Sequence, residues 1–424
     1  MLIFCLSYIA LLTLPSVLID IVQIKYVKSR AKSPAVILPP QDYEISARYA
    51  LENLKLSIIN TLYDTIIFVA WVCVGLRWWQ EILIEESGLG FIVFVLGFLL
   101  ISWGLNLPFK AYKELFLDKK YGFSNANKAI FFSDMIKAFA LIVVFGFLVL
   151  WILLWVMEYE YWWVLGFGII FCLVVLVNML YPTLIAPMFN TFTPLNDEHL
   201  QSKIESLMQK AGFKTNGIFV MDASRRDDRL NAYFGGLGTS KRVVLFDTLL
   251  DKVSSDGLLA ILGHELGHFK NKDIIFNLFV SGLILFGLFF VAGHLPSVLF
   301  ETLGVLDNSA TTIVMLLLIA PVIAFWVMPI SAYFSRRAEY KSDLYGASLT
   351  SPHCLKEALI RLVNENKSFP HSHPLYTFFH YTHPPLLERL CVLDSLISTS
   401  MQKDEAQIDD THTDCGKKDS SKTL

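Results

Sequence analysis

The chain has 424 residues, of which 54% are hydrophobic and only 17% are charged. Soluble domains carry about 25% charged residues, so the composition excludes an ordinary soluble protein and indicates that much of the surface faces a lipid bilayer. The net charge of −3 excludes a strongly basic surface, and we therefore expect no nucleic-acid partner.

Seven apolar stretches are long enough for membrane helices, because a spanning helix needs about 20 mostly apolar residues. In chain order they are Leu2–Gln23, Ile58–Leu76, Leu89–Phe109, Met135–Met157, Trp162–Tyr181, Ile274–Phe300 and Thr311–Phe334. The first has no basic segment before it and no A-x-A-like cleavage site, so we interpret it as an uncleaved anchor. The sequence predicts a mainly α, polytopic membrane protein with seven transmembrane helices.

The charges of the loops predict the orientation. Basic residues follow the first, third and seventh stretches, whereas the short loops after the second, fourth and sixth stretches carry acidic residues. Cytoplasmic loops of membrane proteins are enriched in lysine and arginine. We therefore expect the amino terminus outside, and the carboxyl terminus and the active site on the cytoplasmic side.

The long polar segment after the fifth stretch is the one region that could form an aqueous subdomain. Its residues Asp197–Gly212 have the apolar spacing of an amphipathic helix, and Gly217–Met221 and Arg242–Phe246 resemble short strands. A glycine-rich turn at Gly235, Gly236 and Gly238 lies between these strands.

These patterns divide the chain into five parts. Residues 1–181 hold five membrane helices, 182–273 form a polar cytoplasmic region, 274–334 hold helices six and seven, and 335–397 form a second polar cytoplasmic region. Residues 398–424 are polar without an apolar face, which is typical of a disordered tail.

The motif His264-Glu265-Leu266-Gly267-His268 indicates a metal site. Residues four apart share a helix face, so both imidazoles can bind one Zn²⁺ while Glu265 lies beside them. Such a motif needs context, because two histidines at this spacing also occur by chance. A catalytic zinc ion requires a third protein ligand and an open position.

Glu339 is the preferred third ligand, because it follows the seventh stretch and so returns to the same membrane face as the motif. Asp343 shares its helix face and can fix the tautomer of a ligand histidine. One alternative is a solvated acidic pair. Another is that one of four downstream histidines completes a three-histidine site: His371, His373, His380 and His383.

Taken together, the motifs resemble those of the integral-membrane CaaX prenyl protease type 1 family. They run in order from about Leu107 to Leu393 and comprise Leu107-Pro108, Lys120–Asn125, Ile185–Asn190, Thr193–Leu195, Asn231–Phe234, the HELGH motif, Ser335–Arg337 with Glu339 and Asp343, and His383–Leu390. The resemblance implies seven helices around a chamber, a zincin-like cytoplasmic peptidase region with a small β element, and one Zn²⁺ per chain. It also implies that Asn231 and His383 lie near the scissile peptide and that Arg389 supports the site.

We expect the zinc to acidify a water molecule, Glu265 to act as general base and His383 to stabilise the oxyanion. An extended substrate could pair with Val243–Phe246 or with Asn231–Phe234. Two roles have simpler alternatives: Asn231 may only cap a turn, and Arg389 may only form a salt bridge with Glu388 or Asp394.

The substrate is a peptide or protein, prenylated if the resemblance extends to it. The compact length and simple loops favour a bacterial inner membrane, where the alternative function is quality control of damaged or misfolded membrane proteins. Two rival classes are a channel, which requires charges at the centres of the apolar stretches, and a haem carrier, which requires histidines on facing membrane helices. Neither pattern is present in the sequence.

Overall fold

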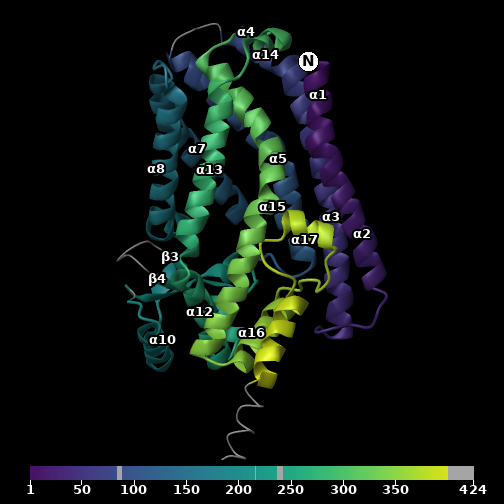
Figure 1. The fold of residues 1–424 in the computed structure, drawn as a ribbon, viewed down its shortest axis with the longest axis vertical. Coiled ribbons are helices and arrows are strands. Elements are labelled where there is room, and N and C mark those ends of the chain that lie inside the picture. The colour runs from purple at the N-terminus through teal and green to yellow at the C-terminus, as the bar shows by residue number, and fades with distance from the viewer. Residues whose placement is uncertain (84–87, 215, 236–241, 400–424) are drawn as a thin grey trace, which may run out of the picture.

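The computed structural model describes residues 1–83, 88–214, 216–235 and 242–399, and the fold is mainly helical (Figure 1). Within these residues, seven helical segments are long and apolar enough to cross a membrane: Leu2–Arg30, Pro40–Ile82, Gly88–Lys120, Lys128–Val156, Trp162–Phe189, Asp273–Gly293 and Ser309–Leu349. All seven predicted spans are confirmed. The sixth ends at Gly293 rather than Phe300, because Pro296 precedes a separate short helix.

The first five spans contain the following helices, several of them continued by π-helical turns: α1 (Leu2–Tyr8), α2 (Leu14–Arg30), α3 (Pro40–Ala70), α4 (Leu76–Ile82), α5 (Gly88–Tyr112), α6 (Asp118–Lys120), α7 (Lys128–Val156), α8 (Trp162–Leu180) and α9 (Ala186–Phe189). The remaining helices are α10 (Glu198–Lys210), α11 (Asp247–Lys252), α12 (Ser255–Lys270), α13 (Asp273–Gly293), α14 (Ser297–Leu303), α15 (Ser309–Leu349), α16 (Pro352–Glu365) and α17 (Pro374–His380). Residues 386–399 are also helical.

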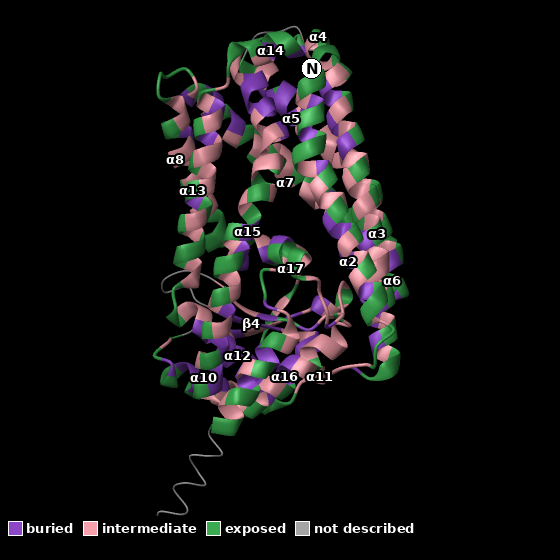
Figure 2. Ribbon diagram, turned by 45° about the vertical axis from the view of Figure 1, so that its right-hand side comes forward, coloured by how far each residue is buried: buried purple, intermediate pink, exposed green. Residues whose placement is uncertain are grey.

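The membrane helices pack tightly at one end of the bundle. There α4 and α14 close the bundle (Figure 1), and apolar residues such as Trp71, Val95 and Met315 form the largest buried cluster. Exposed residues lie along the membrane helices (Figure 2), and many of them are large hydrophobic residues, as expected for a surface in lipid.

The inner faces of α2 and α3 are polar. A cavity of about 420 Å³ between them and their neighbours is lined by Ser16, Thr61 and Asp64, together with Asn106 of α5. Polar groups at membrane depth are tolerated where they line protein cavities. The bundle therefore encloses a cavity whose wall combines polar with apolar side chains.

The opposite end carries a four-stranded sheet of β1 (Phe192–Pro194), β2 (Ile218–Met221), β3 (Ala232–Gly235) and β4 (Arg242–Phe246). The strand order is β1-β2-β4-β3, in which β2 and β4 are parallel and the other pairs are antiparallel. The two predicted strands and the predicted helix after Asp197 are confirmed. Gly236 and Gly238 of the predicted turn, and the tail from residue 400, lie outside the described residues.

The sheet order decides which strand can pair with a substrate. Because β4 lies between β2 and β3, both of its edges are already hydrogen-bonded, and the expectation that Val243–Phe246 pairs with substrate is wrong. Within the described strands, β3 is at the end of the sheet and keeps one edge. The other expectation, that an extended substrate pairs with Asn231–Phe234, therefore remains open.

Candidate active site and metal centre

Two helices, α12 and α15, cross at unusually close range because small residues line their contact. A Cβ atom added to Gly346 of α15 would lie 2.6 Å from the backbone nitrogen of His264, and one added to Gly267 of α12 would lie 2.7 Å from the Cα of Ser342. Because the two backbones are so close, side chains of α12 and α15 can reach one another.

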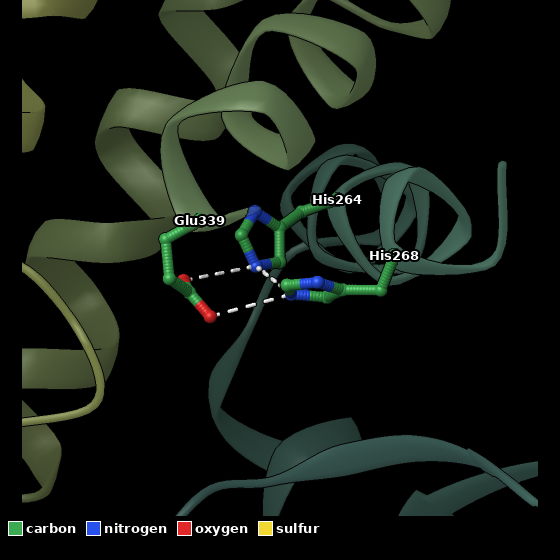
Figure 3. Close-up of side chains that lie close together, drawn as sticks. All are labelled: His264, His268 and Glu339. Carbon is green, nitrogen blue, oxygen red and sulfur yellow. Dashed lines mark hydrogen bonds and ion pairs between the residues drawn. The ribbon is translucent and has the colours of Figure 1, made fainter. Parts of the chain in front are cut away.

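The two histidines of α12 and Glu339 of α15 converge on one point (Figure 3). His264 Nε2 lies 3.4 Å from Glu339 Oε2, His268 Nε2 lies 3.3 Å from Glu339 Oε1, and the two Nε2 atoms are 3.2 Å apart. Within the described part of the chain, this is the single group of three or more histidine, cysteine, aspartate or glutamate side chains whose ligand atoms all lie within 4.8 Å of one another. The downstream histidines His371, His373 and His380 are not part of it.

The other ring nitrogen of each histidine faces an acidic residue. His264 Nδ1 lies 2.8 Å from Asp343 Oδ1, and His268 Nδ1 lies 2.9 Å from Asp273 Oδ2 and 3.1 Å from the hydroxyl of Ser342. Such carboxylate partners fix the tautomer of a ligand histidine so that Nε2 points at the metal.

Arg389 connects the two carboxylates of α15. Its Nε and one terminal nitrogen donate to Asp343 at 2.8 and 2.6 Å, and its other terminal nitrogen lies 3.4 Å from Glu339 Oε2. Arg389, Asp343 and Glu339 are all nearly inaccessible to solvent. The simpler alternative, a salt bridge with Glu388 or Asp394, is not what the fold shows, since Glu388 accepts from Tyr340 and Asp394 pairs with Lys356.

A cavity of about 520 Å³ opens onto the convergence point and is lined by Glu265, His383 and Asn231 as well as by His264 and Glu339. His383 Nε2 lies 3.2 Å from Glu339 Oε1 on a largely exposed side chain. Asn231 accepts a hydrogen bond from the backbone N–H of Ala232, so it caps the start of β3 and also faces the cavity.

The residues present fit a bound divalent cation. Glu339 Oε2 is buried and accepts no hydrogen bond from the described residues, and its nearest charged neighbours, at 3.4 Å, are His264 Nε2 and a terminal nitrogen of Arg389. Two imidazole nitrogens and a carboxylate oxygen are a typical donor set for zinc, and three protein ligands leave one position open.

The electrostatics of α12 favour the same conclusion. Burial lowers the pKa of His264, but the carboxylates of Asp343 and Glu339 outweigh burial and raise this pKa to about 9. Burial also raises the pKa of the Glu265 carboxyl, against the opposing effect of the two histidines. Positive charge is therefore stabilised at this point, whether it comes from protons or from a metal.

Two contributions were not predicted from sequence. Asp273 follows α12 after Lys272, whose positive φ of 59° turns the chain into α13 and brings the carboxylate back to His268. Arg336 donates to the backbone oxygens of Thr377 and Tyr381 and so holds the segment before His383. The only signal in the sequence for the role of Asp273 was that it is an acidic residue five positions after His268.

Comparison with known proteins agrees with this geometry. Residues 194–397 match peptidase family M48, and residues 23–191 match the CAAX prenyl protease N-terminal region, described as five membrane helices. The two matches meet between the fifth span and the sheet.

Curated relatives are similar over most of their length. The chain is 34% identical to CAAX prenyl protease 1 of Saccharomyces cerevisiae, over 69% of this chain and 70% of that protein. It is 30% identical to a CAAX prenyl protease 1 homolog of Oryza sativa, over 84% and 88%. The crystal structure of S. mikatae Ste24p matches with a TM-score of 0.82 and 28% identity, over 92% and 98%. These relatives are eukaryotic and give no support to a bacterial membrane.

Proposed function

The chain belongs to peptidase family M48 and to the CAAX prenyl proteases within it, and from this premise we propose that it is a zinc endopeptidase acting on prenylated proteins. It is a multi-pass membrane metallopeptidase. The observation that carries the proposal is the convergence of His264, His268 and Glu339 on one point at the mouth of a cavity.

We assign these three side chains as the ligands of one zinc ion per chain. Zinc held there supplies a Lewis acid that polarises a carbonyl oxygen and acidifies water to a pKa of about 7. Asp343 and Asp273 hold the two imidazoles by their Nδ1 atoms, and Arg389 holds Asp343 and Glu339 in turn. These three residues are positioning residues.

Glu265 is assigned as the general base. It lines the cavity next to His264 and has a raised carboxyl pKa, which suits a group that must both accept and release a proton. It takes a proton from the attacking water and gives it to the leaving amine. His383 and Asn231 line the same cavity and can donate hydrogen bonds to the substrate backbone or the developing oxyanion.

The alternation of basic and acidic loops supports an orientation in which the amino terminus is outside. The sheet and α12 then lie in the cytoplasm together with residues 335–397, at the membrane end opposite to α4 and α14 (Figure 1). The apolar outer faces of the helices contact the lipid bilayer, and the peptide or protein substrate enters from the cytoplasmic side.

Purified protein tests the assignment in two steps. We expect about one zinc per chain and cleavage of a farnesylated CAAX peptide, and we expect Glu265→Gln to keep the zinc while turnover falls by about 10²- to 10⁴-fold. A Glu265→Gln variant with full activity would remove Glu265 from the mechanism. An unfolded membrane protein as competing substrate tests the quality-control alternative, which predicts that it is cleaved faster than the farnesylated peptide.

A further inference from the structure

A second cavity of about 510 Å³ adjoins the active-site cavity and is lined by cationic side chains. The two cavities share Asn366, Phe369 and Tyr381 in their walls. Lys113, Arg229 and Lys367 line the second cavity, and no aspartate or glutamate of the described chain does so. A ligand that extends from one cavity into the other thus meets a positively charged wall.

The positive charge of this wall is only partly neutralised. Arg229 pairs with Asp227 at 2.6 Å and with Asp118 at 3.4 Å. Lys367 Nζ instead donates to the neutral carbonyl of Tyr121, and neither Lys367 nor Lys113 has a carboxylate within 4.0 Å in the described residues. Two uncompensated ammonium groups therefore face the cavity.

Lys367 occupies a backbone position that favours glycine. It follows the last turn of α16 with a φ of 44°, and the N–H groups of Lys367 and Ser368 donate back to Asn364 and Val363 in the usual glycine-ended helix terminus. A lysine there is strained relative to glycine, because its Cβ crowds the following carbonyl oxygen in the left-handed region. The backbone conformation does not explain why residue 367 is a lysine, so the explanation must lie in its side chain. Strained backbone positions of this kind are concentrated at functional sites.

The segment that precedes the edge strand β3 connects the two cavities, because Asn231 lines the active-site cavity and Arg229 lines the second cavity. Leu230 and Asn231 precede β3, and the side chain of Asn366 holds the backbone of Leu230 by accepting from its N–H at 2.8 Å and donating to its carbonyl at 3.3 Å. A substrate added to β3 in the antiparallel sense, the more stable pairing, runs with its carboxyl-terminal residues past Asn231 towards Arg229.

We infer that the second cavity, lined by Lys113, Arg229 and Lys367, binds the free α-carboxylate at the carboxyl terminus of the substrate. The inference rests on the proposed function, in which the substrate ends three residues beyond the cysteine of a CAAX sequence. Three extended residues span about 10 Å, and the path from Asn231 to Arg229 along an extended backbone is about 7 Å. The leaving peptide is thus long enough to reach the wall.

The test compares two farnesylated peptides that are identical except that one ends in a carboxylate and the other in a carboxamide. The wild-type enzyme is expected to cleave the carboxylate peptide with a kcat/KM about ten- to a hundredfold higher than that for the carboxamide peptide. This factor corresponds to the free energy that one charge-assisted hydrogen bond contributes. Lys367→Gly, which also relaxes the backbone, and Lys113→Gln are expected to lower this ratio through KM for the carboxylate peptide alone.

Lys119→Gln serves as the matched control, since Lys119 is exposed in the same basic segment and does not line the cavity. It should keep the wild-type ratio. Equal cleavage of both peptides by the wild-type enzyme overturns the inference and leaves the proposed function intact, whereas cleavage of neither peptide overturns the proposed function. If Lys367→Gly and Lys113→Gln slow both peptides equally, the lysines are structural and the inference is wrong.

Discussion

Replacing Gly346 by alanine should remove the metal site while leaving the fold largely intact. The added Cβ would lie 2.6 Å from the nitrogen and 2.9 Å from the Cα of His264, where ordinary contact begins at 3.4 Å. Because both atoms belong to the backbone of α12, the two helices must separate by roughly 0.8 Å. Overpacking costs about 1–3 kcal/mol, but alanine regains about 1 kcal/mol of helix propensity over glycine, so the net loss of stability is small.

The geometry of the site is far more sensitive than the stability. Metal ligands must keep their distances within about 0.2 Å, and a misplacement near 1 Å costs about a hundredfold in activity. We therefore expect Gly346→Ala to fold, to lose at least a hundredfold in zinc affinity measured by chelator competition, and to lose turnover in parallel. Gly287→Ala in α13 is the control, because no atom lies within 4 Å of its added Cβ. Wild-type zinc affinity in Gly346→Ala would refute the idea that this helix contact sets the site.

Three further results are expected. Arg389→Met should destabilise the protein by about 3–5 kcal/mol in thermal or denaturant unfolding, because it removes the guanidinium that neutralises the buried carboxylates of Asp343 and Glu339 and leaves Asp343 with His264 alone; an unchanged transition would mean that His264 compensates Asp343 without Arg389. Zinc affinity should keep rising with pH from 6.5 to about 9, since the raised pKa of His264 means that zinc must displace a proton throughout that range; a plateau above pH 6.5 would contradict it. Asp273→Asn should weaken zinc binding by about 10- to 100-fold, the usual effect of losing the carboxylate behind a ligand histidine such as His268, and equal affinity would assign that role to Ser342 alone.

The membrane spans and the two α12 ligands were predictable because each depends on local spacing. About 20 apolar residues define a span wherever they occur, and His264 and His268 share a face on any helix. Glu339 required one further step, the count of membrane crossings that returns α15 to the face of α12. The glycines that allow the two helices to approach have no such signal, because Gly267 packs against Ser342 and Gly346 against His264, and these contacts between distant positions exist only in the packed fold.

The partners of buried charges were the least predictable part of the site. Arg389 has two acidic neighbours in sequence, Glu388 and Asp394, and local reasoning offered these as alternatives to a role at the site. In the fold it contacts Asp343 instead, because burial makes an unpaired carboxylate costly and only Arg389 reaches it with two donors. The choice of the strand that pairs with substrate was open for a similar reason. Whether β4 is central and β3 lies at an edge is decided by the order of the strands in the sheet, and that order is not a local property of either sequence.

The continuity of α15 connects the chemistry to the bilayer. Met315 lies in the apolar cluster at the closed end of the bundle, and from there to Glu339 the same helix rises about 36 Å at 1.5 Å per residue. The hydrocarbon core is about 30 Å thick, so this length of helix is enough to cross it between Met315 and Glu339. Because no loop intervenes, the depth of the carboxylate is fixed by the membrane span itself. A peptide whose lipid anchor stays in the bilayer can therefore present its backbone to the site without leaving the membrane, which a soluble enzyme with the same ligands could not arrange.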